Sequence, residues 1–174
     1  MPDIDALDWR GWFERKHEGF FARPSIRGLP DELIYEEMAL DLTDAARAVP
    51  PVPVAGDVGF GFYDGSLAAL REVVGRVDAT WPELFGEGDR VYCALDGDRI
   101  ASFCMVEDNG TIEGLRVGGP GCVGTAPEYR RRGIGLRMVQ KVTELLRAEG
   151  FQLAYIHYTG VGPWYAKLGY RTVL

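Results

Sequence analysis

The segment Arg130–Gly135 carries three arginines and two glycines at close spacing, between an apolar run and an amphipathic one. Where a strand leads into a helix, the first helical N–H groups have no partner within the helix and lie at the positive end of its dipole. Gly133 and Gly135 would let a ligand approach this backbone, and Arg130–Arg132 add positive charge. The segment predicts a phosphate or pyrophosphate site. A solvated basic turn with glycines for packing is the alternative.

Two common nucleotide-binding motifs are absent from this segment. A P-loop needs Gly-Lys followed by Ser or Thr, and the chain has no such run. A dinucleotide fingerprint needs a third glycine, but Met138 stands three residues after Gly135. The closely spaced Gly59 and Gly61 lie within a strand-like pattern, where a bulge or close packing explains them. The helix start would therefore bind an anion in another way.

The elements that must position this segment alternate between strand and helix patterns. Apolar residues at three-to-four spacing predict helices over 66–77, 133–149 and 163–168. Apolar runs predict strands over residues 57–63, 90–95, 99–106, 122–125, 153–158 and 170–174. An Asp-Gly pair at residues 96–97 predicts a hairpin between the second and third of these strands. The pattern indicates a mixed α/β (α+β) fold with antiparallel hairpins and one crossover helix.

The first 55 residues follow a different pattern. Residues 1–48 look helical in two pieces, one containing Trp9, Trp12 and Phe13 and the other covering residues 31–48. The proline-rich run at residues 49–54 favours an extended connector. We therefore expect an N-terminal helical extension and connector over residues 1–55, and the main domain over residues 56–174. The extension could pack on the main fold or form one wall of a substrate pocket.

Two motifs resemble those of the GNAT superfamily of N-acetyltransferases. Arg130-x-x-Gly133-x-Gly135, preceded by a strand and Pro-Glu-Tyr, is similar to the family's acyl-CoA-binding motif. Trp-Tyr-Ala-Lys-Leu-Gly-Tyr at residues 164–170 is similar to its Tyr-x-Lys-x-Gly-Phe ending. The resemblance covers about residues 56–174. It implies a mostly antiparallel sheet with a V-shaped split between central strands, helices on both faces, and acetyl-CoA as the acyl donor.

The resemblance also implies roles for individual residues. The backbone of Val123, Gly124 and Thr125 would line the pantetheine arm, and an N–H near Val123 would polarise the thioester carbonyl. Tyr165 matches the general acid that protonates the departing thiolate, a task suited to a phenol that is neutral at pH 7. A packing role is the alternative for Tyr165. The residues expected to bind the rest of the donor are Arg130, Arg131, Arg132, Gly133, Ile134, Gly135 and Leu136.

The general base that deprotonates the amine has several candidates. Glu107, Glu113 and His157 are available, and we select Glu113 because it lies shortly before the central strand. His157 shares a strand face with apolar residues, which is also typical of a hydrogen-bonded core histidine. Cys122, close to the expected thioester, offers an acyl-cysteine route that direct attack by an amine does not need.

Two features depart from the family pattern. Tyr158 stands where many members have an Asn that contacts the pantetheine. The family usually has two strands after its last helix, whereas this chain has one before Leu174. The sheet is either shortened, or completed by a segment of residues 1–55 or by another subunit. An open edge would favour strand pairing between subunits, so a homodimer is one expectation.

Composition narrows the class of protein further. Across 174 residues, 19 Lys and Arg stand against 26 Asp and Glu, giving a net charge of −7 that disfavours a nucleic-acid partner. No apolar run is long enough for a membrane span, and no signal-peptide pattern begins the chain. Three widely spaced cysteines predict neither a disulfide framework nor a metal site. We therefore expect a cytoplasmic protein.

The distribution of charge bears on the substrates. The arginines gather at residues 130–132, where an anionic donor would bind, while the acids are spread over the rest of the chain. This favours a cationic acceptor, either a small molecule or a protein amine. The sequence thus predicts an N-acetyltransferase that moves acetyl from acetyl-CoA to a primary amine by direct attack in a ternary complex. A catalytically inactive CoA-binding or sensory module with this fold is the alternative.

Overall fold

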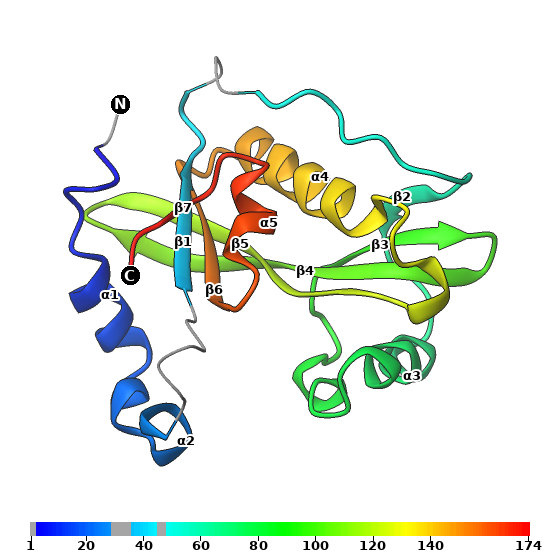
Figure 1. Ribbon diagram of the computed structural model, residues 1–174, viewed down its shortest axis with the longest axis horizontal. Coiled ribbons are helices and arrows are strands. Elements are labelled where there is room, and N and C mark those ends of the chain that lie inside the picture. The colour runs from blue at the N-terminus through cyan, green and yellow to red at the C-terminus, as the bar shows by residue number, and fades with distance from the viewer. Residues whose placement is uncertain (1–2, 29–35, 45–47) are drawn as a thin grey trace.

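The computed structural model describes residues 3–28, 36–44 and 48–174. One seven-stranded sheet, in the order β2-β3-β4-β5-β6-β1-β7, runs through them (Figure 1). Every neighbouring pair is antiparallel except β5 and β6, which are parallel. The predicted mixed, mostly antiparallel sheet is therefore confirmed. The strands are β1 (Glu36–Asp41), β2 (Gly59–Phe62), β3 (Val91–Asp96), β4 (Arg99–Ile112), β5 (Leu115–Thr125), β6 (Leu153–Thr159) and β7 (Arg171–Thr172).

Helices cover both faces of the sheet, as predicted (Figure 1). α4 (Ile134–Ala148) and α5 (Gly162–Ala166) pack on one face, and α3 (Leu67–Val77) and α1 (Trp9–Lys16) pack on the other. A short helix, α2 (Pro24–Arg27), follows α1. The hydroxyl of Ser66 accepts from the Ala69 N–H and caps α3, as its sequence position indicates. No helix within the described parts of the chain is long and apolar enough to cross a membrane.

β1 corrects the prediction of a helix over residues 31–48, for the part of that segment that the structure describes. Residues 36–41 form a strand between β6 and β7, with Met38 opposite both Ile156 and Thr172. Met38 and Leu40 pack on the α4 side, whereas Ala39 packs on the α1 side. A strand buried on both faces lacks the alternation that distinguishes it from a helix. Residues 31–35 and 45–47 lie outside the described residues.

β1 also completes the sheet beside the strand that follows the last helix. The strand comes from the segment expected to be a helical extension, and it fills the place between β6 and the two-residue β7. A segment of residues 1–55, rather than a second subunit, therefore continues the sheet. Residues 36–41 are therefore part of the central sheet and not an extension beside it.

The hairpin of β4 and β5 is longer than the sequence indicated. Both strands were expected to be short, but they extend to a turn at Glu113 and Gly114, which have φ angles of 49° and 83°. Glycines inside β5 hid the strand pattern, and packing explains them. A Cβ at Gly118 would lie 2.6 Å from a methyl carbon of Leu146, and one at Gly119 would lie 2.2 Å from the Tyr155 carbonyl oxygen.

The split between the central strands is present where it was expected. β5 and β6 pair only at Val117–Leu153 and Gly118–Ala154, so their later residues are free to diverge. On the other side of β5, Phe103 pairs with Gly124 and Met105 with Gly121. One β4 residue, Cys104, therefore faces two β5 residues, Cys122 and Val123, which is a β-bulge. Cys122 accordingly has a positive φ of 45°.

Candidate active site

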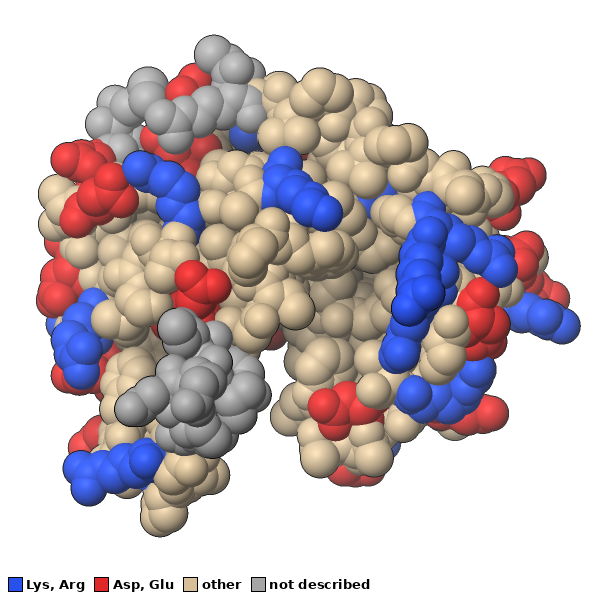
Figure 2. Space-filling model, in the orientation of Figure 1, with Lys and Arg blue, Asp and Glu red and all other residues tan. Residues whose placement is uncertain are grey.

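Two cavities meet where β5 and β6 separate. The first, about 520 Å³, is the split cavity, and its lining includes Cys122, Val123 and Tyr165. The second, about 570 Å³, is the acidic cavity, and its lining includes Asp89 and Asp108. Leu84, Glu107 and His157 line both, so the cavities form one cleft. Figure 2 shows the surface hollowed between the part that carries α1 and α2 and the part that carries α3.

Tyr165 reaches the split cavity from α5, on the α4 face of the sheet. Its ring is 7% exposed and packs edge-on against Trp164, with the ring centroids 4.8 Å apart. Burial raises the pKa of the Tyr165 phenol well above its usual range, with a smaller contribution from the neighbouring Cys104 and Cys122. The phenol therefore stays protonated at neutral pH and can donate a proton.

Glu107 reaches the same cavity from the opposite face of the sheet. On β4, Val106 packs on the α4 side while Met105 packs on the α3 side, and strand alternation places Glu107 with Met105. Its carboxylate lies over Gly121, where a Cβ would come 2.3 Å from Oε1. Burial raises the pKa of the Glu107 carboxyl, although His157 and Lys16 act in the opposite direction. A carboxylate with a raised pKa is suited to accept a proton from an amine.

Glu113, the base selected from the sequence, is not brought to the cleft. It lies at the tip of the β4–β5 hairpin, is exposed, and lines neither cavity. Its Oε1 accepts from the Asp8 N–H at 3.4 Å, before α1. Glu113 was expected near the cleft because it lies shortly before the central strand; β4 runs to Ile112 and β5 begins at Leu115, so residue 113 stands in the distant turn between them. Glu107, the other carboxylate candidate, occupies the position instead.

His157 lines both cavities and is tied to a carboxylate that the sequence did not single out. The Oε2 atom of Glu37, on β1, lies 3.2 Å from His157 Nδ1 and accepts from the Tyr158 N–H at 3.0 Å. The Tyr155 hydroxyl also donates to it. Glu37 was missed because it stood in a predicted helix, and only the pairing of β1 with β6 places it beside His157.

α1 contributes one wall of the acidic cavity. His17, just after α1, stacks on His157 with ring centroids 4.8 Å apart and planes 5° from parallel. Burial lowers the pKa of His17, and the neighbouring His157 and Lys16 lower it further. Trp12 Nε1 donates to the Thr111 carbonyl at 2.9 Å and holds α1 against the β4–β5 hairpin. This part of the first 48 residues therefore packs on the main fold, and its His17 lines the acidic cavity.

The predicted anion site lies at the start of α4. Gly133 is the N-cap in a left-handed conformation, and among the described residues no side chain caps the start of the helix. Arg130 Nε donates to the Thr125 carbonyl and an Arg132 N–H to the Glu128 carbonyl. Arg131, which has a φ of 63°, makes no hydrogen bond or ion pair with the described residues.

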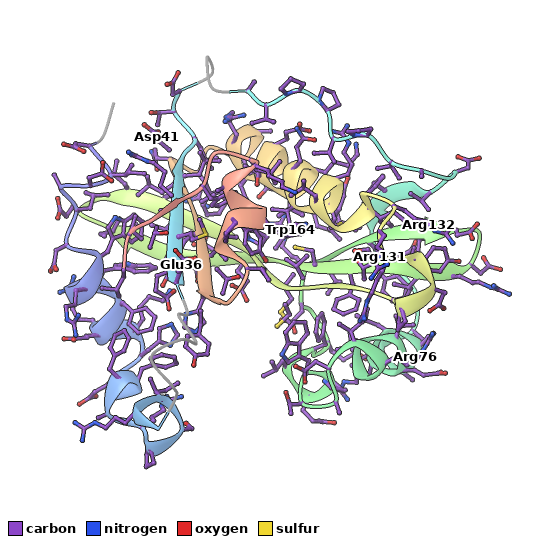
Figure 3. All side chains as sticks on the ribbon, viewed as in Figure 1. Glu36, Asp41, Arg76, Arg131, Arg132 and Trp164 are labelled. Carbon is purple, nitrogen blue, oxygen red and sulfur yellow. The ribbon has the colours of Figure 1, made fainter. Side chains whose placement is uncertain are left out.

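A basic surface surrounds this helix start. Figure 3 shows Arg131 and Arg132 in the loop before α4, with Arg76 of α3 beside them. Figure 2 shows a band of Lys and Arg side chains in this place. Arg76 also forms an ion pair with Glu128 at 2.6 Å. The loop between β5 and α4 therefore offers unpaired amides and positive charge on one exposed surface, which fits a pyrophosphate.

The two glycines of the motif have a different role from the one predicted. A Cβ at Gly133 would lie 2.3 Å from the Pro53 carbonyl oxygen, and one at Gly135 would lie 2.9 Å from Thr125 Oγ1 and 3.4 Å from the Trp164 ring. Both glycines therefore allow other parts of the chain to approach the start of α4. The packing alternative describes them better than close approach by a ligand.

Cys122 does not have the properties of a nucleophile. Burial raises the pKa of its thiol to about 11, and the nearby Glu107 adds to this effect. At neutral pH the thiol is almost entirely protonated, and the thiolate is the reactive form. The acyl-cysteine route is therefore not favoured. Within the described ranges, no group of three or more His, Cys, Asp or Glu side chains is arranged to hold a metal ion.

Residues 87–172 match the family model described as an acetyltransferase (GNAT) domain. No curated protein matches the sequence significantly. One similar solved structure is fungal, described as a GCN5-related glucosamine N-acetyltransferase region of a multi-domain GH3 β-N-acetylglucosaminidase. It has a TM-score of 0.66 and 22% identity, and the match covers 92% of this chain and 22% of that chain.

Two further structures have the same fold. A GCN5-related N-acetyltransferase from Sphaerobacter thermophilus has a TM-score of 0.55 and 18% identity, over 79% of this chain and 48% of that one. An acetyltransferase from Trypanosoma brucei has a TM-score of 0.53 and 20% identity, over 66% of this chain and 93% of that one. The chain thus corresponds to about a fifth of the fungal protein and about half of the Sphaerobacter protein.

The open sheet split between β5 and β6, with a basic helix start beside it, belongs to the fold that these structures share. Residues 87–172 are thus an acetyltransferase domain of the GNAT family. At these identities the solved structures describe the fold alone.

Proposed function

We propose that the chain transfers acetyl from acetyl-CoA to a primary amine by direct attack in a ternary complex. The observation that carries the proposal is that Glu107 and Tyr165, from opposite faces of the sheet, line one cavity. Two such side chains are normally kept apart by the sheet between them. Here β5 and β6 stop pairing after Gly118 and Ala154, so a base and an acid can serve the same reacting centre.

The residues of the cleft fit an acyl-CoA donor. When bound, acetyl-CoA supplies an activated thioester. The first turn of α4 and the side chain of Arg131 would hold its pyrophosphate, because both are without partners among the described residues. The bulge at Cys122 and Val123 interrupts the regular ladder of β5, and a backbone N–H freed there would polarise the thioester carbonyl.

The two side chains then divide the proton transfers. Glu107 accepts a proton from the amine as nitrogen bonds to the thioester carbon. Tyr165 donates its phenolic proton to the sulfur as the carbon–sulfur bond breaks. Direct attack needs no covalent enzyme intermediate, in agreement with the protonated Cys122 thiol.

The acidic cavity would bind the acceptor. Asp89, Glu107 and Asp108 line it, and they favour a substrate whose amine is protonated in solution. Arg90 also lines it, but this guanidinium is held by Glu149 in a two-bond ion pair. A cationic primary amine therefore suits this cavity better than an anionic acceptor. The fungal neighbour, named for glucosamine acetylation, makes glucosamine one amine to test.

The test is CoA release from acetyl-CoA with a panel of amines that includes glucosamine, putrescine and a lysine peptide. We expect faster release with at least one cationic amine and formation of the matching amide by mass spectrometry. Acetyl-CoA should also raise the melting temperature, since it binds the folded chain only. A melting shift without CoA release for any amine would indicate an inactive CoA-binding module. No shift at saturating acetyl-CoA would contradict donor binding itself.

A further inference from the structure

The most deeply buried acid beside the cleft is Glu37, and its bonding is unusually specific. The side chain is 5% exposed, and a single oxygen, Oε2, receives the Tyr155 hydroxyl, the Tyr158 N–H and the His157 ring. A buried carboxylate is stable only if it is paired and hydrogen-bonded. The pairing with His157 links this carboxylate to a side chain that lines both cavities.

This bonding determines how the His157 ring is protonated. The backbone N–H of Tyr158 can only donate, so Oε2 of Glu37 is an acceptor there. An ionised carboxylate oxygen can only accept, so the ring nitrogen that faces Oε2 must be the donor, and Nδ1 of His157 carries the hydrogen. In a neutral imidazole the other nitrogen, Nε2, is then without a proton and can accept one.

The reaction needs such an acceptor, because an ammonium substrate loses two protons. The reactants R–NH3+ and acetyl-CoA yield the amide, the thiol CoA–SH and one H+. One nitrogen proton stays in the amide and one balances the proton that Tyr165 gives to sulfur. The third must leave the cleft. Glu107 is largely buried, whereas the His157 side chain is 38% exposed and therefore open to solvent.

We propose that Glu37 is a positioning residue that holds His157 with Nε2 free, and that His157 carries the surplus proton from the cleft to solvent. The proposal rests on the proposed acetyl transfer. It assigns a role to a strand outside residues 87–172, the range that matches the family. Nε2 takes the proton from the amine or from Glu107, and water at the exposed ring edge removes it.

The charged groups around His157 come from several elements. His17 from the end of α1 stacks on the ring, and Glu107 from β4 interacts with it electrostatically. Glu37 lies on the β1 side, and Tyr155 and Tyr158 flank it on β6 itself. Lys16 and Arg23 act electrostatically on His17. Two carboxylates, those of Glu37 and Glu107, therefore stand near the His157 ring, together with the stacked ring of His17.

The protonation state can be measured directly. The chain has two histidines, so a long-range ¹H–¹⁵N spectrum contains two imidazole patterns, and His17→Gln assigns them. In the wild type at alkaline pH we expect His157 with its proton on Nδ1. In Glu37→Gln this preference should be lost, and both forms of the ring should be populated. The matched control is Glu36→Gln on the same strand, whose carboxylate bonds to Thr172 and not to His157.

The spectrum has two outcomes that overturn the positioning role. One is a wild-type ring protonated at Nε2, and the other is an unchanged ring in Glu37→Gln. Because the measurement does not depend on turnover, it tests Glu37 even if the acceptor is still unidentified.

The outlet role is tested with an amine that the wild type acetylates. His157→Asn keeps an N–H for Glu37 but has no titratable nitrogen, and we expect kcat to fall on the order of 10²-fold. KM for acetyl-CoA should stay unchanged, and free imidazole should restore part of the rate to His157→Ala. Wild-type kcat in His157→Asn would overturn the outlet alone. A wild type inactive with every amine in the panel would overturn the proposed function and the outlet with it.

Discussion

Glu107 shows how a single residue can be costly for folding and useful for reaction. Because burial raises the pKa of its carboxyl in the folded protein, the protonated form contributes stability below the unfolded pKa. That contribution is lost as the pH rises through the folded value. Burying the charged carboxylate costs folding free energy, and such a cost is typical of a group that must take a proton from its substrate at neutral pH.

We predict that Glu107→Gln lowers kcat by 10²- to 10⁴-fold and removes this pH-dependent loss of stability. As the pH is raised from 4 to 8, the melting temperature of the variant should rise relative to that of the wild type. Thermal unfolding of both proteins at several pH values measures this difference. The control is Glu113→Gln at the exposed hairpin tip, expected to change neither quantity. A larger rate loss in Glu113→Gln than in Glu107→Gln would reverse the assignment of the base.

Tyr165 and Tyr170 allow an acid to be distinguished from a packing residue. Both are buried, but Tyr170 shares a 2.8 Å hydrogen bond with Thr143 Oγ1, whereas the Tyr165 hydroxyl has no such partner in the described chain. We predict that Tyr165→Phe lowers kcat with little change in KM for acetyl-CoA. Tyr170→Phe should instead cost about 1 kcal/mol of stability and leave kcat unchanged. Steady-state kinetics and denaturant unfolding of both variants test this. A lower kcat in Tyr170→Phe with an unchanged kcat in Tyr165→Phe would contradict the assignment.

At this scale the motifs identified Tyr165 and the basic loop before α4, but not the pairing of Glu37 with His157. Tyr165 and the arginine turn belong to the motifs themselves, so a local pattern identifies them. Glu37 and His157 are 120 residues apart and meet only through the pairing of two strands. Glu113 was preferred to Glu107 because it lies shortly before the central strand, and the sequence did not show that the β4–β5 hairpin turns at this residue.

Among the elements, those with local signals were predicted best. α3 and α4 have a regular apolar stripe, and the hairpin of β3 and β4 has an Asp-Gly turn, so neighbouring residues define them. β1 has no such signal, because its apolar residues are buried on both faces of the sheet. Whether this segment is a helix or a strand depends on β6 and β7, more than 100 residues away.

Just past the last paired positions, Gly118 and Ala154, β5 and β6 still pass close to each other at Gly119. A Cβ at Gly119 would lie 2.2 Å from the Tyr155 carbonyl oxygen, a backbone atom that cannot turn aside. We predict that Gly119→Ala destabilises the protein by about 1–3 kcal/mol or more. Gly61→Ala on β2 is the matched control, because nothing lies within 4 Å of its missing Cβ. Equal midpoints of urea unfolding for the two variants would disagree with this close approach.

For the molecule as a whole, β1 decides what can fold. Residues 56–174 contain both sequence motifs and were expected to be the main domain. Without β1, however, β6 loses its antiparallel neighbour, and β7 loses the neighbour that it has in the described sheet. Met38 and Leu40 would also leave the core that α4 covers. We predict that a 56–174 fragment shows no cooperative thermal unfolding, whereas the full chain does. A sharp transition in the fragment, with an upward shift on adding acetyl-CoA, would contradict this.

The distribution of charge also belongs to this scale. The net charge of −7 is a sum that hides two regions of opposite charge: a basic band beside α4 and an acidic cavity beside β4. The acidic cavity opens into the split cavity, whereas the basic band lies at the start of α4 and lines neither cavity. Their separation suits two substrates of opposite charge that enter one cleft from different directions.

The position of β1 also sets the order in which the molecule can be built during synthesis. Residues 36–41 are synthesised well before their partners, residues 153–159 and 171–172. Loop closure over such a separation is slow, and the early strand would meanwhile expose two apolar faces. The nascent chain therefore holds an unpaired, aggregation-prone strand until residues 153–172 have emerged, and its sheet can close only then.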